Sequence, residues 1–384
     1  MRYVSFSITA ILAMAILILP SCGNPVTETI TLQDIHQINE TAFGRPGNKY
    51  AWSMATLNDT ALFVGTNNFD LLNEAPPDDP TLWKGCEIWR YDGATWTPVV
   101  EEGLNDRNNL GVRDLKELNG CLYATTMNLT NGMELWRSCN GTDWETLVNN
   151  GFGLVANNSG RGLAYYKGHL YVGTINPSLG AQIWRSTDGT AWDQVASGGI
   201  SDSDNTWISD LIEYNGWLYA GTANSLGMQL YRTDDGVNYE RIFEGGAGVP
   251  QNTHAMVLYE FNNKLFISTM NLQLGFYLYM SDNGINFTAV LQNGFTHPKN
   301  NYIWSLQEYN GRLYAGSFYN DYLFFGHFQL YSSADGIDWI VENTNALGYT
   351  FNYGLRSMDV FDNKLIMGTT SFFSGCRVIE ATAK

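Results

Sequence analysis

Three arginines stand at the same offset within a repeated pattern. An asparagine recurs at Asn48, Asn109, Asn157, Asn205, Asn252, Asn300 and Asn352, and the residue four positions later is Arg113, Arg161 or Arg356 in three of these places. A guanidinium fork matches a carboxylate or a sulfate. In a chain with a formal net charge of −17, the three arginines predict an anion-binding site. The competing interpretation is that they form ion pairs with Asp114 and Asp210.

Two residues that could transfer protons occupy a neighbouring offset. His254 and Tyr302 each lie two positions after a recurring asparagine. A lyase that cleaves an acidic polysaccharide by β-elimination needs a cation to neutralise the uronate carboxylate, and an acid and a base to move protons. The arginines could do the first and His254 and Tyr302 the second, so these two are candidate catalytic residues.

Aromatic residues occupy some of the same offsets and two loops on the same predicted face. The candidates for stacking on a ligand are Trp52, Trp207, Tyr319, Tyr322, Phe324 and Phe372. Exposed rings at such density indicate a contact surface for a sugar or a protein. The competing interpretation is that the two loops that contain the last four residues pack on each other.

A repeat of roughly 48 residues must position these side chains. A leucine that opens a strand recurs at Leu62, Leu122, Leu170, Leu218, Leu265, Leu313 and Leu365. Each unit contains tight-turn signals such as Asn215-Gly216 and Asp188-Gly189 between short apolar runs, which is the pattern of four antiparallel strands. The sequence therefore predicts an all-β fold, a seven-bladed β-propeller of four-stranded blades.

The propeller is assigned to residues 29–384. Its blades are expected at about 48–100, 109–149, 157–197, 205–244, 252–292, 300–343 and 352–384 plus 29–39. The last repeat stops after its third strand, while Ile35 to Ile38 matches the pattern of a fourth strand. We therefore expect an N-terminal strand to complete the last blade and to close the ring, which removes an exposed sheet edge.

The turn Ser186-Thr-Asp188-Gly189-Thr-Ala-Trp192 and its relatives in the other repeats resemble the Asp-box of sialidase-like propellers. The usual Ser-x-Asp-x-Gly-x-Thr-Trp pattern has one more residue between Asp and Gly, and the sialidase fold has six blades. The resemblance implies a propeller and not a sialidase.

The recurring asparagines and all the long connections share one face of the predicted propeller, because antiparallel strands alternate in direction. Binding residues concentrate in loops that a rigid scaffold holds, so this face, with the mouth of the central channel, is the expected functional face. An identical asparagine in every repeat serves the repeat itself, and we interpret these residues as structural. The acidic insertion at 67–85 is expected to be a solvated loop on this face.

The N-terminus has the features of a secretory signal. Arg2 precedes an apolar run from Ile8 to Leu19, and Leu19-Pro20-Ser21-Cys22 resembles a prokaryotic lipobox. We expect residues 1–21 to be a lipoprotein signal peptide, Cys22 to be lipidated, and 22–28 to be the linker. The protein would then be secreted and held in a prokaryotic cell envelope by its lipid anchor only.

Four cysteines follow Cys22. Cys121 opens the second strand of its repeat and Cys139 closes the third, so a disulfide between them is plausible. Cys86 and Cys376 occupy matching positions in the first and last repeats, and the sequence leaves their pairing open. The spacing of Cys and His gives no support for a metal site.

The acidic balance argues against nucleic-acid binding, and no sequence motif indicates a cofactor or demands catalysis. We expect a monomeric lipoprotein, at the cell surface or in the periplasm, whose propeller face binds a polysaccharide or protein ligand. The alternative is a carbohydrate-active enzyme, a lyase that acts on an acidic polysaccharide.

Overall fold

A computed structural model describes residues 30–68, 84–320 and 326–384 of the chain. In this part of the chain, 28 strands form one sheet, within which antiparallel pairing defines seven groups of four. The first three groups are β2 (Tyr50–Leu57), β3 (Ala61–Asn67), β4 (Ile88–Tyr91) and β5 (Trp96–Val100); β6 (Gly111–Leu118), β7 (Cys121–Met127), β8 (Leu135–Ser138) and β9 (Glu145–Val148); and β10 (Ser159–Tyr166), β11 (His169–Ile175), β12 (Ile183–Ser186) and β13 (Asp193–Ala196).

The remaining groups repeat this order. They are β14 (Asn205–Tyr214), β15 (Trp217–Asn224), β16 (Leu230–Thr233) and β17 (Glu240–Phe243); β18 (His254–Phe261), β19 (Lys264–Met270), β20 (Leu278–Ser281) and β21 (Thr288–Leu291); β22 (Asn300–Tyr309), β23 (Arg312–Tyr319), β24 (Leu330–Ser333) and β25 (Trp339–Asn343); and β26 (Gly354–Phe361), β27 (Lys364–Thr370), β28 (Val378–Ala383) and β1 (Leu32–Gln37). Short helical turns η1 (Thr41–Gly44), α1 (Gly198–Ser201), η2 (Gly245–Gly248) and η3 (Ala346–Gly348) connect some of the groups.

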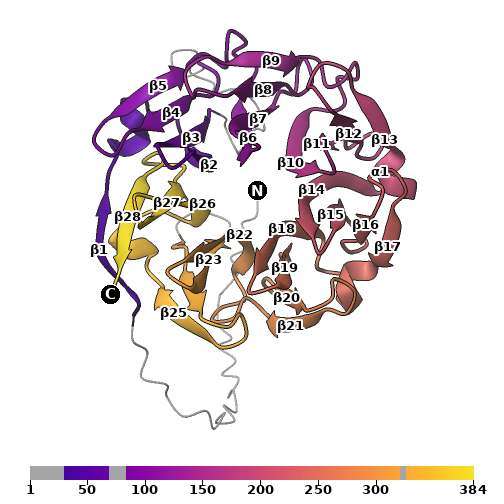
Figure 1. The fold of residues 1–384 in the computed structure, drawn as a ribbon. Helices are drawn as coiled ribbons and strands as arrows, with labels where there is room; N and C mark the ends of the chain where they lie inside the picture. Colours follow the sequence, from indigo (N-terminus) through magenta and orange to yellow (C-terminus); the bar gives the residue numbers. More distant parts are fainter. Residues whose placement is uncertain (1–29, 69–83, 321–325) are drawn as a thin grey trace, which may run out of the picture.

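The groups are arranged around a common centre (Figure 1). The first strand of each group lies innermost, and single residue pairs such as Met127 with Ser159 and Ile175 with Trp207 join the second strand of one group to the first strand of the next. The pairing of β2 with β27 through Tyr50 and Thr370 completes the circle. The two inner strands of every group therefore form a closed ring, a connection that the sequence did not predict.

The N-terminal strand lies beside the last strand of the chain. Leu32 pairs with Ala383 and Gln37 pairs with Ile379, so β1 runs antiparallel to β28 (Figure 1). The expectation that the N-terminal segment supplies an outer strand for the last repeat is confirmed. Leu32 is 3% exposed and packs in a cluster with residues of the last two groups, so β1 contributes to the core as well as to the sheet.

The tight turns follow from local chemistry. In the turn after β12, Asp188 Oδ1 accepts hydrogen bonds from the backbone N–H groups of Thr190 (2.7 Å) and Ala191 (3.0 Å), and the Gly189 N–H donates to Ser186 Oγ (2.8 Å). Gly189 has a φ of +80°, which an L side chain rarely adopts. The Asp188 carboxylate and the Ser186 hydroxyl therefore serve the turn itself.

Apolar side chains fill the space between neighbouring groups. One cluster contains Phe63 of β3, Val112 of β6 and Trp136 of β8, and all three are fully buried. Burying a large apolar side chain contributes about 1.5–3 kcal/mol. These contacts between adjacent groups make the ring a rigid scaffold.

The recurring asparagines are structural, as predicted. Asn157 Nδ2 donates to Gly151 O (2.9 Å) and to Gln182 Oε1 (2.7 Å), and its Oδ1 accepts from Thr174 Oγ1 (3.3 Å) and Asn176 Nδ2 (2.9 Å). The side chain thus ties the entry of the innermost strand to the two strands behind it. The glutamine in this network was not anticipated.

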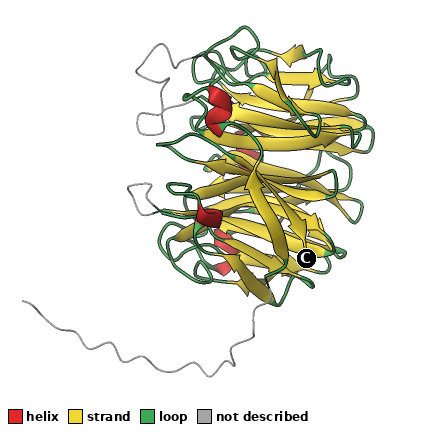
Figure 2. Cartoon of the chain, turned by 90° about the vertical axis from the view of Figure 1, so that its left-hand side faces the viewer, coloured by secondary structure: helices red, strands yellow, loops and turns green. Residues whose placement is uncertain are grey.

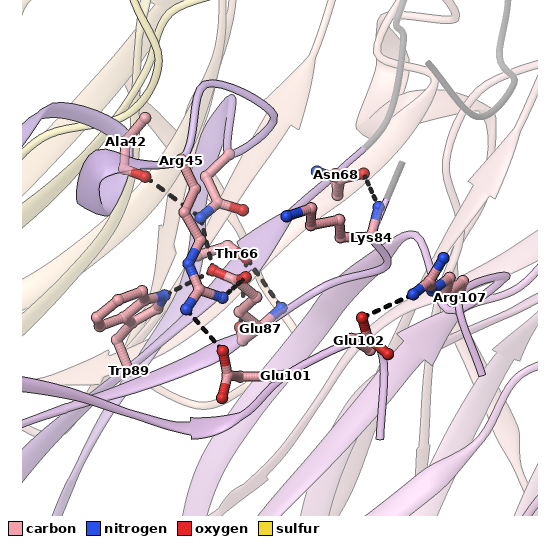
Figure 3. A network of polar contacts seen from close by, with 11 residues as sticks. Ala42, Arg45, Thr66, Asn68, Lys84, Glu87, Trp89, Glu101, Glu102 and Arg107 are labelled. Carbon is pink, nitrogen blue, oxygen red and sulfur yellow. Dashed lines mark hydrogen bonds and ion pairs between the residues drawn. The ribbon is translucent and has the colours of Figure 1, made fainter. Parts of the chain in front are cut away.

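In the first group a glutamate takes the place of that glutamine (Figure 3). Glu87 accepts hydrogen bonds from Asn48 Nδ2 (2.8 Å) and Trp89 Nε1 (2.8 Å) and forms an ion pair with Arg45. Arg45 also contacts Glu101 at 2.6 Å. The charge of the buried Glu87 is therefore compensated within the framework.

Cys121 and Cys139 form a disulfide. Leu122 of β7 pairs with Ser138 of β8, which brings the two cysteines side by side at the end of this strand pair. Cys86 and Cys376 are free and fully buried. Burial raises the pKa of Cys376 to about 12, so its thiol remains protonated at neutral pH.

The two sides of the molecule differ. The helical turns between the groups lie on one side, and the chain ends toward the other (Figure 2). We call the side with the helical turns and the recurring asparagines the mouth face. The fourth strand of each group runs toward the mouth face, so β1 begins near the opposite face.

Candidate ligand site in the central channel

Two cavities lie along the inner strands of the ring. The mouth cavity, with a volume of about 400 Å³, is lined by aromatic and sulfur-containing side chains together with Arg113 and Arg356. The inner cavity, about 340 Å³, lies beside the middle of the innermost strands and is lined by more polar residues. Five residues border both cavities: Trp52, Arg113, Met256, Trp304 and Arg356. These five mark the waist of the channel.

A β-bulge directs the waist residues toward the channel. On β6 the pairing with β7 passes from Val112 to Asp114 and skips Arg113, and on β26 it passes from Leu355 to Ser357 and skips Arg356. The same skip occurs at Trp52, Ser209, Met256 and Trp304. An unpaired residue in a bulge points away from the regular pleat. The position four after each asparagine is thus the bulged position in six of the seven groups.

The third group departs from this rule. Arg161 pairs with Gly173, and the skipped residue is Gly162, whose φ is +73°. Arg161 lines the inner cavity and not the mouth cavity. The prediction that all three arginines surround the mouth is therefore wrong for Arg161, because the bulge in β10 falls one residue later.

The arginine belt, defined as Arg113, Arg161 and Arg356, is held by ring faces and one carbonyl. The Arg113 guanidinium carbon lies 4.7 Å from the Trp52 ring centre and 5.0 Å from that of Trp207. Arg356 lies 4.5 Å from the Trp304 ring centre and 5.6 Å from that of Trp52. Arg161 Nη2 donates to Met256 O at 2.7 Å.

No carboxylate of the described residues lies within 4.0 Å of a belt guanidinium. Asp210, the expected partner, accepts from Lys116 Nζ at 3.0 Å and from the backbone N–H groups of Leu211 (2.9 Å) and Leu258 (3.0 Å). Asp114 accepts from the Leu163 N–H at 3.2 Å. The interpretation that the arginines pair with these two aspartates is therefore wrong.

Burial and mutual repulsion disfavour the charged form of the belt arginines. Burial, together with repulsion from Arg161, lowers the pKa of Arg113 to about 9, and burial with repulsion from the other two arginines lowers that of Arg356. An arginine side chain stays protonated in proteins, so the belt is treated as three positive charges. A cation–π contact contributes about 0.5–2 kcal/mol, whereas removing an ion from water costs several kcal/mol. The ring contacts do not offset this cost alone, although the charges of Asp210 and Asp114 also favour the charged form of Arg161.

His254 and Tyr302 have different surroundings from those predicted for an acid–base pair. His254 contacts Thr253 Oγ1 through Nδ1 (2.9 Å) and the edge of Trp207, with ring centres 4.8 Å apart, and it is not a lining residue of either cavity. Burial and the charges of Arg161 and Arg113 lower its pKa to about 3. Tyr302 lines the mouth cavity, stacked on Phe318 at 4.3 Å, and burial raises its pKa well above the ordinary value.

The aromatic candidates divide into three groups. Trp207 lines the mouth cavity, where part of its surface is accessible. Trp52 is 5% exposed, lines both cavities and lies beside the guanidinium groups of Arg113 and Arg356, and its stacking on a ligand stays a prediction. Tyr319 contacts His297, Phe372 contacts Phe373, and Tyr322 and Phe324 lie outside the described residues.

Several lining residues were missed because they belong to the second strand. Met127, Ile175, Met270 and Phe318 line the mouth cavity, and each lies five residues after the recurring leucine of its repeat. They are joined to Ser159, Trp207, Tyr302 and Gly354 at the start of the next innermost strand. The repeat register could have found them by the same count that found the arginines.

Exposed apolar side chains occur on the mouth face. The connections on the mouth face carry Leu129, Val155, Leu179, Leu226, Leu272, Leu274, Phe295, Phe351 and Phe373, which are 37–71% exposed. We call these nine residues the apolar rim. Such a concentration on one face is typical of a contact surface.

The described residues contain no cluster of three or more His, Cys, Asp or Glu side chains that could hold a metal ion. A helix long and apolar enough to span a membrane is likewise not found among them.

Comparison with known proteins defines the fold class. No protein-family model matches the sequence, and no curated protein matches it either. The structure is similar to the WD40 β-propeller domain of Doa1, with a TM-score of 0.54, 12% sequence identity, and coverage of 90% of this chain and 97% of that one. The β-propeller domain of the Trilobed protease from Pyrococcus furiosus gives a TM-score of 0.48 at 10% identity, covering 86% and 93%. The chain therefore has an all-β, β-propeller fold.

Proposed function

We propose that this protein is a cell-envelope lipoprotein whose β-propeller binds a glycan at the mouth of its channel. The observation that carries the proposal is the mouth cavity. Its volume of about 400 Å³ falls within the range of small-ligand sites. Aromatic walls beside unused N–H donors suit a sugar, which has apolar ring faces and polar edges.

The proposal includes the finer architecture. The seven groups of four strands are taken as seven blades with Asp-box-like turns, and Cys22 as the lipidated residue. Since β1 begins near the face opposite the mouth, a linker that runs from Cys22 to β1 would attach there. The mouth would then point away from the membrane, toward ligands in the surroundings.

A glycan array probed with the full-length protein in detergent tests this function. We expect binding to a subset of glycans that is weakened at least tenfold by Trp207→Ala, because Trp207 lines the mouth cavity. Tyr165→Ala is the matched control, since Tyr165 is an aromatic residue that is 40% exposed and lines neither cavity. No glycan binding, or equal loss in both variants, would contradict the proposal. In that case the apolar rim would favour a protein ligand.

A uronate lyase is the second candidate, and the absence of carboxylate partners for the arginine belt among the described residues favours it. His254 weakens it, because this side chain does not line the cavity that Tyr302 lines. The test is to follow the ultraviolet absorbance of the unsaturated product with pectate, alginate, ulvan and glycosaminoglycans. An increase in absorbance that His254→Gln and Tyr302→Phe abolish would establish catalysis. No increase with any of these polysaccharides would exclude lyase activity toward them.

A further inference from the structure

The arginine belt retains most of its hydrogen-bonding capacity. Arg113 and Arg356 make no hydrogen bond to another described residue, and Arg161 makes one. A guanidinium group has five N–H donors. One buried nitrogen in each arginine has no hydrogen-bond partner: Arg113 Nε, Arg161 Nη1 and Arg356 Nε. The Arg161 residue is 7% exposed and the Arg356 residue is 5% exposed. Donors left unsatisfied in a buried site strongly favour an acceptor.

The carboxylates nearest the belt, Asp210 and Asp114, form hydrogen bonds and an ion pair with other groups. Lys116 and two backbone N–H groups hold Asp210, and the Leu163 N–H holds Asp114. Both aspartates line the inner cavity and neither lines the mouth cavity. On the mouth side of the belt, the lining residues therefore include two cations and no acid.

The mouth cavity leads to the belt. Arg113 and Arg356 border both cavities. In each of these two residues, Nε is the one guanidinium nitrogen that is both buried and without a hydrogen-bond partner. The terminal nitrogens therefore reach open space. These terminal nitrogens are the ones that form the two parallel hydrogen bonds of a fork with an oxyanion.

We infer that the arginine belt binds the carboxylate or sulfate group of a sugar that occupies the mouth cavity. The inference rests on the proposed glycan-binding function and names the class of glycan, an acidic one. The sugar ring lies between Trp207 and Tyr302, and its anionic group accepts hydrogen bonds from Arg113 and Arg356. Arg161, behind them, adds positive charge.

Isothermal titration calorimetry on the full-length protein in detergent tests the inference, with glucuronate, glucose 6-sulfate, glucose and inorganic sulfate as probes. We expect glucuronate or glucose 6-sulfate to bind at least tenfold more tightly than glucose. Equal affinity for the charged and the neutral sugars, or no binding of either charged sugar, would overturn the inference. Inorganic sulfate that binds as tightly as the charged sugars would support the anion site and contradict the proposed glycan-binding function.

Variants separate the belt from the rest of the protein. The double variant Arg113→Gln with Arg356→Gln should lose the preference for charged sugars, while Arg241→Gln, which removes an exposed arginine that pairs with Glu244 on the outer side of the ring, should keep it. Circular dichroism checks that each variant is folded. Arg356→Lys retains the charge without the fork and serves if the glutamine variants do not fold; it should bind the charged sugars more weakly than the wild type.

The same titrations distinguish the two levels of the argument. If neutral glycans bind in a manner that Trp207→Ala abolishes, while a charged group adds no affinity, the inference fails and the proposed function stands. If neither neutral nor charged glycans bind, both fail.

Discussion

The side chains at the waist of the channel share one register position and differ in chemistry. Trp52, Arg113, Met256, Trp304 and Arg356 all lie four residues after a recurring asparagine, and a bulge directs each of them inward. The asparagines are identical because they serve the strand entries. The bulged positions line the channel and vary in residue type, so the residues at these positions determine the chemistry of the site.

At this scale the first prediction concerns His254. Its pKa of about 3 lies below the ordinary value near 6.5. Between these pH values the unfolded chain binds a proton that the folded protein does not. The contribution of this residue to stability is therefore complete above about pH 6.5 and decreases as the pH falls toward 3. Imidazole NMR at pH 5 should find His254 neutral, and a titration midpoint near 6.5 would contradict the effect assigned to its surroundings.

The sequence predicted the arginine belt in part. Counting from the asparagines identified the three residues, because every repeat preserves this spacing. The count could not predict the bulges, because they depend on backbone pairing, and so it misplaced Arg161. The count also could not predict that Asp210 would form its ion pair with Lys116 and not with an arginine of the belt.

At the scale of strands, the disulfide fixes the second and third strands of one group. Cys121 and Cys139 are 18 residues apart, and a cross-link over a loop of this size stabilises by about 3 kcal/mol. Replacing both residues with serine should lower the free energy of unfolding by about 2–3 kcal/mol, measured by urea denaturation. Since the disulfide lies far from the channel in the repeat, glycan binding should not change. An unchanged free energy of unfolding would show that the bond adds no stability.

The N-terminal strand gives a second prediction at this scale. β1 pairs with β28 and covers it, and the Thr31 N–H donates to Glu342 Oε2 at 2.9 Å, which also ties β1 to the preceding group. A chain that begins at Glu40 should therefore lose several kcal/mol of stability and aggregate through the exposed edge of β28. Size-exclusion chromatography and thermal denaturation measure both effects. A monomeric, equally stable truncated chain would contradict the role assigned to β1.

Strands and turns were easier to predict than their connections. Asn215-Gly216 and Asp188-Gly189 mark tight turns because few residues tolerate the backbone angles required, and Ile35 to Ile38 matched a missing strand through its apolar pattern. The bridges that close the inner ring involve single residue pairs such as Met127 with Ser159. A single backbone pair has no side-chain signature, so it could not be predicted from residue types.

For the molecule as a whole, the mouth and the beginning of β1 lie on opposite faces. With a lipid at Cys22, the mouth face should lie away from the membrane. Dyes attached at Leu226→Cys on the mouth face and at Val237→Cys on the opposite face report this in vesicles. Energy transfer to a membrane acceptor should be stronger from the dye at position 237. Equal transfer from the two dyes, or stronger transfer from the dye at position 226, would contradict this orientation. The free cysteines Cys86 and Cys376 are buried and should not react with the dye.

The central claim is that an acidic sugar binds at the arginine belt through the mouth cavity. Its most direct test is a glycan array probed in parallel with the wild type and with the Arg113→Gln, Arg356→Gln double variant. We predict that the wild type retains acidic glycans and that the folded double variant loses them. The claim would be contradicted if the wild type bound no acidic glycan, or if the wild type and the double variant bound the same acidic glycans.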